Sequence, residues 1–152
     1  MNRKPAMRTL TRTLLGLAVL ASTGFQAADT PAKARVLLMT GDDVSPAHDW
    51  LSCATATREV LRESGRFDVD VIGGAEALAN EANLENVDAI YLMLYNARTP
   101  TLSDRSKENL RNFVRGGKGL VFHHTFGHDV RAINTPEVKR LIVQGTAWAA
   151  GK

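Results

Sequence analysis

Short apolar runs alternate along this chain with longer segments in which apolar residues recur at helical spacing. Four apolar runs are typical of strands, at residues 35–40, 67–72, 87–95 and 119–123. Three longer segments are predicted helices, at residues 50–64, 103–115 and 135–150. Such alternation implies parallel strands joined by right-handed crossovers. We therefore predict an α/β fold, a flavodoxin-like three-layer sandwich whose short sheet of about four strands has the order 2-1-3-4.

Two of the predicted strands differ in the burial that their patterns imply. Residues 67–72 alternate apolar side chains with Asp68 and Asp70, which predicts a strand at a sheet edge with one exposed side. Residues 87–95 are almost continuously apolar and predict a central strand buried on both faces. Residues 75–83, between these two strands, are rich in alanine and only weakly helical.

The predicted helices have recognisable ends and apolar faces. Ser103 is a good N-cap for the second helix, and Thr135 followed by Pro136 predicts the start of the last one. The expected buried face of the second helix is Ser106, Leu110, Phe113 and Val114. The expected buried face of the last helix is Val138, Leu141, Ile142, Gly145, Trp148 and Ala149.

The N-terminus has the order of a secretory signal peptide: basic residues, a short apolar run and then small residues. The apolar run at 14–21 is shorter than the roughly 20 residues that span a bilayer. We predict cleavage of residues 1–28, with Gly24 as the alternative last residue, leaving residues 29–152 as one small domain in the periplasm or outside the cell. This domain would have no stable membrane anchor; an uncleaved N-terminal anchor is the alternative.

Loss of the leader also changes the charge of the protein. Four of its 19 basic residues and none of its 16 acidic residues lie in residues 1–28, so the mature chain has a net charge of −1. A nucleic-acid partner is therefore not expected, because such proteins usually carry a basic face. The single cysteine, Cys53, falls on the apolar side of the first helix and is expected to be a core residue rather than a reactive thiol.

All four histidines occur in two short segments that follow predicted strands. His48 lies after the first strand, and residues 123–128 contain the other three after the last strand. Ligands of open α/β sheets bind outside the carboxyl ends of the strands, and histidine suits proton transfer and metal ligation near neutral pH. We therefore predict a shared site above Asn96, which follows the central strand.

Residues near His48 and His128 would complete this site. We expect His48, His124, His128 and Asp129 to be its acid/base groups. Asp42, Asp49 and Trp50 would bind the substrate together with Asn96, Trp50 as a stacking surface for a sugar ring. The alternative is structural: the aspartates would be turn and N-cap residues, and Trp50 the first core residue of its helix.

A metal site is a second alternative. A divalent cation could be bound by some of His48, His124, His128 and Asp129, which are chemically suitable ligands. Their spacing matches no standard metal motif.

The Gly116-Gly117-Lys118-Gly119 segment resembles a phosphate loop but leads from a helix into a strand, so it should lie at the edge of the sheet opposite the predicted site.

Several segments together resemble the ThuA-like (trehalose-utilisation) family, which shares the class I glutamine amidotransferase-like fold without its cysteine nucleophile. The similar segments are Val36–Gly41, His48–Trp50, Leu61–Val69, Leu102–Asp104, Phe113–Val121, Thr125–Asp129 and Gly145–Gly151. His48, His128 and Asp129 match family motifs, and His124 matches the middle histidine approximately. The chain departs from the family in lacking its long middle section, since two motifs appear fused across Gly119 to Thr125.

The resemblance implies an exported domain that binds or transforms a sugar, either a disaccharide or an oxidised glucoside, in carbohydrate utilisation. Whether the domain is an enzyme stays open. The alternative is a non-catalytic binding or interaction module, a shortened copy of the family. Loss of the middle section would expose apolar sheet edge, which favours a homo-oligomer.

Overall fold

The computed structural model describes residues 32–41, 49–94, 102–122 and 129–152. All of them belong to one compact unit, Pro31–Lys152. Its centre is a four-stranded sheet of order β2-β1-β3-β4, in which every neighbouring pair is parallel. The strands are β1 (Ala34–Thr40), β2 (Phe67–Gly73), β3 (Ala89–Leu92) and β4 (Gly119–Phe122). The predicted fold class and strand order are thus confirmed.

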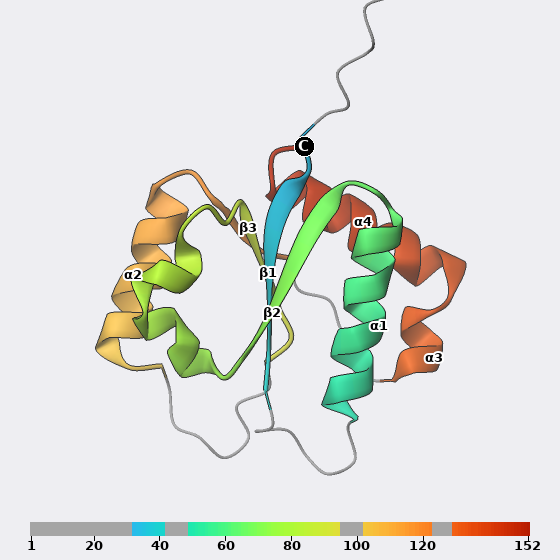
Figure 1. The fold of residues 1–152 in the computed structure, drawn as a ribbon, viewed down its shortest axis with the longest axis horizontal. Coiled ribbons are helices and arrows are strands. Elements are labelled where there is room, and N and C mark those ends of the chain that lie inside the picture. Colours follow the sequence, from blue (N-terminus) through green and yellow to red (C-terminus); the bar gives the residue numbers. More distant parts are fainter. Residues whose placement is uncertain (1–31, 42–48, 95–101, 123–128) are drawn as a thin grey trace, which may run out of the picture. The chain divides into compact units, whose positions relative to one another are not determined.

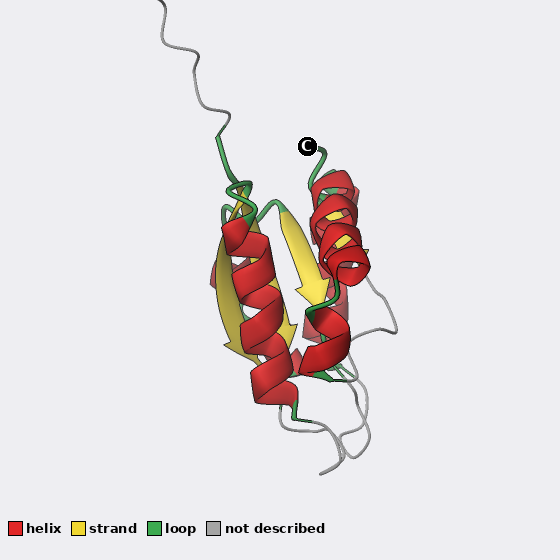
Figure 2. Cartoon of the chain, turned by 90° about the vertical axis from the view of Figure 1, so that its right-hand side faces the viewer, coloured by secondary structure: helices red, strands yellow, loops and turns green. Residues whose placement is uncertain are grey.

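Helices cover both faces of the sheet (Figures 1 and 2). One face carries α1 (Trp50–Glu63), α3 (Val130–Ile133) and α4 (Pro136–Ala149). The other face carries α2 (Asp104–Arg115) and two 3₁₀ turns, η1 (Ala75–Ala79) and η2 (Glu81–Leu84). The connection from β1 to β2 crosses the sheet in one direction, and the connections from β2 to β3 and from β3 to β4 run in the other. Right-handed crossovers therefore place α1 on one face and α2 on the opposite face.

Strand β1 supplies both hydrophobic cores because its side chains alternate between the two faces. Val36 and Leu38 pack with α1 and α4, whereas Leu37 and Met39 pack with α2 and η1. The β2 strand is a sheet edge, as predicted: Phe67 and Val69 are buried, and Asp68 and Asp70 are exposed. The observed β3 ends at Leu92, within the longer predicted segment 87–95.

Polar side chains precede the helices and glycines follow them, as the sequence predicts. Asp49 caps α1, and Gly65 after that helix has φ +71°. Ser103 caps α2 through a hydrogen bond from the Ser106 N–H, and Gly117 follows the helix with φ +79°. Positive φ values suit glycine because it has no Cβ. Thr135 also precedes α4 as predicted, although its hydroxyl donates to the Ala132 carbonyl instead of capping.

Hydrogen bonds that the apolar periodicity does not predict join helix α2 to η1. The Glu76 carboxylate accepts hydrogen bonds from the Ser103 N–H at 2.8 Å and from the Ser106 hydroxyl at 3.4 Å. Asn109 is buried and its Nδ2 donates to the carbonyls of Leu78 and Ala79. Because Asn109 and Phe113 occupy the inner face, Val114 is exposed, and its predicted burial was wrong.

The predicted buried face of α4 was also partly wrong. Ile142 is buried as expected, but Thr146 and Ala147 are the other buried residues. Leu141 is 38% exposed and Trp148 is 82% exposed. The apolar arc of α4 is therefore wider than the part that the sheet and α1 cover. The short helix α3, capped by Asp129, was not predicted.

Within the part of the chain that the structure describes, none of the helices has the length and apolar character needed to cross a bilayer.

Candidate functional site

The strand order reverses between β1 and β3, and the carboxyl ends of these strands define the edge where an open α/β sheet usually binds ligands. At this edge β1 ends at Thr40 and β3 ends at Leu92. Helices α1 and α3 begin beside it, on the same face of the sheet (Figure 1). The candidate site is therefore built from the ends of two strands and the starts of two helices.

Three of the predicted site residues can be placed in the structure: Asp49, Trp50 and Asp129. The other five lie outside the described residues, namely Asp42, His48, Asn96, His124 and His128. The shared pocket that was expected for the histidines therefore stays a prediction. The described residues do include Asp49, which follows His48, and Asp129, which follows His128.

Asp49 is the N-cap of α1. One of its carboxylate oxygens accepts a hydrogen bond from the Ser52 N–H at 3.0 Å. Hydrogen bonds from the side chain and the backbone of Ser52 lower the pKa of Asp49 from its ordinary value. Asp49 is therefore ionised at neutral pH, beside the positive end of the α1 dipole. Its N-cap role is the structural alternative raised from the sequence.

Asp129 has the same role at α3. Its Oδ1 accepts from the Ala132 N–H at 3.0 Å, and its Oδ2 lies 3.1 Å from an Arg131 guanidinium nitrogen. The Ala132 hydrogen bond, and then the Arg131 hydrogen bond, lower the pKa of Asp129. An ionised carboxylate can accept hydrogen bonds but has no proton to donate. Any catalytic part for Asp129 at neutral pH is therefore that of a base or of a fixed negative charge.

Cys53 shows that these two aspartates lie in one neighbourhood. Burial raises the pKa of the Cys53 thiol, and the charges of Asp49 and Asp129 raise it further. The residue is 3% exposed, and α1 and α3 pack together. Asp49 and Asp129, which are 80 residues apart in the sequence, thus both lie near enough to Cys53 for their charges to act on its thiol. The burial of Cys53 confirms it as a core residue, and the raised pKa favours the protonated thiol.

Trp50, the first residue of α1, is partly exposed. It begins the helix directly after Asp49 and is neither fully buried in the core nor fully open to solvent. An indole in this position can pack against the core with one part of its surface and present another part to a ligand. Its predicted stacking role is chemically reasonable and stays a prediction.

Thr40 is a residue of this edge that the sequence interpretation missed. It ends β1, and strand alternation places its side chain on the α1 face with Val36 and Leu38. It is 2% exposed, and its hydroxyl has no hydrogen-bond partner among the described residues. Burying an unpaired hydroxyl is costly, so such a group at a ligand-binding edge is a candidate ligand contact. The signal in the sequence was a polar residue directly after the apolar run Val36–Met39.

The described residues do not test the metal alternative. Among them, no three His, Cys, Asp or Glu side chains gather closely enough to bind a cation, and every histidine of the chain lies outside them.

The segment that resembles a phosphate loop can be placed through Lys118. The Lys118 ammonium lies 3.2 Å from the Asp88 carboxylate, just before β4. The glycine-rich segment around it is thus at the amino edge of the sheet, as predicted from its helix-to-strand context.

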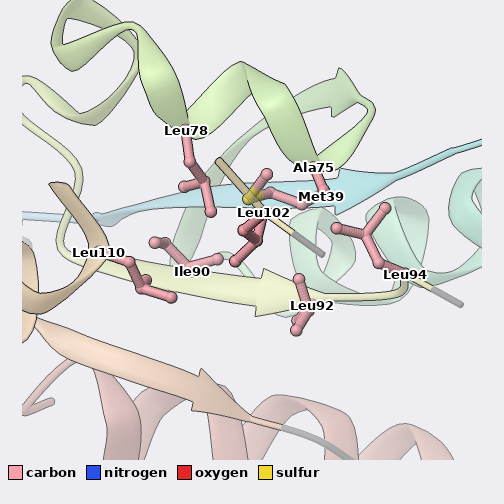
Figure 3. A pocket seen from close by; sticks show the side chains of 8 residues that line it. All are labelled: Met39, Ala75, Leu78, Ile90, Leu92, Leu94, Leu102 and Leu110. Atoms are coloured by element: carbon pink, nitrogen blue, oxygen red, sulfur yellow. The ribbon is translucent and has the colours of Figure 1, made fainter. Parts of the chain in front are cut away.

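An apolar pocket of about 170 Å³ lies on the opposite face of the sheet, between β1, β3, η1 and α2 (Figure 3). Its lining consists of Met39, Ala75, Leu78, Ile90, Leu92, Leu94, Leu102 and Leu110. None of these side chains offers an oxygen or nitrogen to a ligand. Sugar recognition requires several hydrogen bonds to hydroxyl groups, so this pocket does not fit a sugar.

The fold and this edge define the chain as a flavodoxin-like α/β domain with two acidic helix N-caps at its candidate site. The sequence matches no family model and no curated protein. Among solved structures, the chain is similar to a protein from Parabacteroides merdae that is named ThuA-like, with a TM-score of 0.48 and 20% sequence identity. The similarity covers 60% of this chain and 33% of that protein, so the chain spans about a third of the length of that structure.

Proposed function

We propose that this protein is an exported ThuA-like domain that binds or transforms a sugar, either a disaccharide or an oxidised glucoside. The sequence motifs that resemble the ThuA-like family support this proposal, and the α/β fold is compatible with it. The observation that carries it is the packing of α1 against α3, the two helices that Asp49 and Asp129 cap beside Cys53. Each aspartate directly follows a histidine of the proposed site, His48 or His128.

The chemistry of this edge suits a polyhydroxylated ligand. Ionised carboxylates accept hydrogen bonds from sugar hydroxyls, and such charge-assisted bonds are stronger than neutral ones. The partly exposed Trp50 offers an apolar surface for the face of a pyranose ring. His48, His124 and His128 would supply acid/base or metal-binding groups near neutral pH.

Calorimetric titration of the purified protein tests the proposal. The ligands are trehalose, related glucosides and their 3-keto forms, each with and without added Mg²⁺ or Zn²⁺. We expect heat of binding that weakens at least about tenfold in affinity in the His48→Ala and His128→Ala variants, since a hydrogen bond to a ligand contributes about 1–3 kcal/mol when charged groups take part. Thr40→Val should weaken binding as well, because it removes the unpaired hydroxyl.

Glu108→Ala is the matched control. Glu108 is an exposed acidic residue on α2, on the other face of the sheet, so this variant should bind like the unmodified protein. Equal affinity in the unmodified protein and in both histidine variants would contradict the proposed site. Absence of binding to every sugar would contradict the proposed function.

A second candidate is the interaction module. The exposed apolar residues Leu141 and Trp148 favour it, since both lie on one side of α4 and large exposed apolar side chains that share a surface often mark contact sites. Self-association without sugar binding would support this second function over the first.

A further inference from the structure

Helix α4 has an apolar arc that is only half covered. Ile142 and Ala147 pack into the core between the sheet and α1. Leu141 and Trp148, which are two turns apart, lie on the outer part of the same helix, and both are exposed. Gly145 lies between them on the helix surface, one turn after Leu141. An indole that is 82% exposed next to a leucine and a glycine forms a short apolar stripe, defined here as Leu141, Gly145 and Trp148.

Among the described residues, β4 is the edge strand beneath α4, since it pairs only with β3. An edge strand can offer the backbone N–H and C=O groups of its second side for pairing with another strand. Its sequence, Gly-Leu-Val-Phe, contains no charged residue. The opposite edge is different: β2 carries Asp68 and Asp70, which pair with Lys33 and Arg35 of the β1 segment at 3.5 and 3.4 Å. Charges of this kind protect an edge from pairing, and β4 lacks them.

The contact between α4 and β4 relates the stripe to this edge. A Cβ added at Gly119 would overlap the Ala149 carbonyl, so the end of α4 lies directly on the start of β4. Because α4 follows β4 in the chain, packs on β4 and β3, and ends over the start of β4, it runs antiparallel to the strand. The middle of β4 is about 5 Å from Gly119, which corresponds to about three helical residues. This position on α4 is close to Gly145, the centre of the apolar stripe.

We propose that two copies of this chain form a symmetric dimer by antiparallel pairing of their β4 edges, with α4 packed against α4. Strands pair about 4.8 Å apart, and α4 packs on both β4 and β3. The two helices would then lie roughly 10 Å apart, the usual distance between packed helices. With the two-fold axis near Gly145, Leu141 of one copy meets Trp148 of the other.

The charges at the two ends of α4 fit this arrangement. Glu137 is exposed in the first turn, and Lys152 is exposed just after the last turn. An antiparallel pair of helices brings Glu137 of one copy towards Lys152 of the other, twice by symmetry. A surface that is complementary to itself in this way suits a second copy of the same chain. The proposal does not depend on the sugar site.

Sedimentation velocity over a range of concentrations tests the dimer. We expect the purified protein to dimerise and Trp148→Glu to weaken the dimer at least about tenfold, since it places a charge in an apolar contact. Val71→Glu is the matched control: Val71 is also an exposed apolar residue, 44% accessible, but lies on the opposite edge strand β2. Circular dichroism checks that each variant is folded.

A charge exchange tests the antiparallel pairing itself. Leu141→Arg alone should also weaken the dimer, whereas the combination of Leu141→Arg with Trp148→Glu should restore it, because the two new charges of opposite sign would face each other across the two-fold axis. A monomer at every concentration would overturn the proposal. A dimer unaffected by Trp148→Glu, or a double variant weaker than both single ones, would overturn the proposed contact of the two α4 helices.

Discussion

Single carboxylates hold neighbouring elements of this domain together, and Asp88 is the clearest case. Its backbone N–H donates to the Arg35 carbonyl, and its carbonyl accepts from the Gly119 N–H. Its side chain accepts from the Arg35 N–H at 2.9 Å and lies 3.2 Å from the Lys118 ammonium. One residue thus connects β1, β3 and β4 at the amino edge of the sheet, opposite the candidate site.

The pH dependence of stability should reveal this connection. The hydrogen bond from the Arg35 N–H, followed by Lys118, lowers the pKa of Asp88. Because the folded pKa lies below the unfolded value, the stabilisation is present above the unfolded pKa and is lost as the pH falls through the folded one. The free energy of unfolding of Asp88→Asn, measured with urea, should therefore be lower than that of the unmodified protein at about pH 7. The difference should shrink towards about pH 3.

Lys118→Ala is the control for the cause of this shift. It removes the ion pair but keeps the hydrogen bond from Arg35, which is the larger cause, so most of the pH dependence should remain. A deficit of Asp88→Asn that is the same at both pH values would show that the charge of Asp88 does not contribute.

At the scale of elements, sequence patterns predicted the ends of helices better than their buried faces. Asp49 and Ser103 cap helices through local hydrogen bonds that a short segment of sequence determines. The buried face of α4 depends instead on how much of its apolar arc the sheet covers. Leu141 and Trp148 are exposed although they are apolar, like the buried residues Ile142 and Ala147 of the same helix. Periodicity identifies such an arc but cannot tell which part of it is in contact.

The candidate site shows the same difference between residues that a short sequence pattern identifies and residues whose role depends on tertiary packing. Asp49 and Asp129 were identified because each follows a histidine, and they cap two helices that pack together on one face of the sheet. Thr40 was missed because a strand-ending threonine looks ordinary until the lack of a partner for its hydroxyl is seen. Partners in space depend on tertiary packing, which a single sequence does not encode in any short pattern.

The docking of α4 on β4 depends on the absence of a side chain at Gly119. Gly119→Ala would force the Ala149 carbonyl away, because the added carbon has no room. We expect the free energy of unfolding to fall by about 1–3 kcal/mol, the usual cost of overpacking, in urea denaturation. Gly73→Ala at the end of β2 is the control, since its Cβ would meet nothing within 4 Å and its φ is not positive. Equal losses in both variants would argue against close docking at Gly119.

At the scale of the whole molecule, two hydrophobic cores share one thin sheet. Leu38 and Tyr91 belong to the core under α1 and α4, whereas Leu37 and Ile90 belong to the core under α2. Neighbouring residues of the same strand thus enter different cores. Loss of one core should therefore remove support from the sheet and so from the other core.

The positions of the two tryptophans allow this coupling to be measured. Trp50 is on α1 and Trp148 is on α4, so tryptophan fluorescence reports only on one face of the sheet. Phe113→Ala changes the other face, where Phe113 is 8% exposed within the α2 core, and should destabilise the domain by about 3–5 kcal/mol. If the sheet couples the two cores, the urea midpoint from fluorescence should fall together with the midpoint from circular dichroism. A fluorescence midpoint that stays at the value of the unmodified protein while the circular dichroism transition splits would mean that the α1 and α4 face unfolds independently of the α2 face.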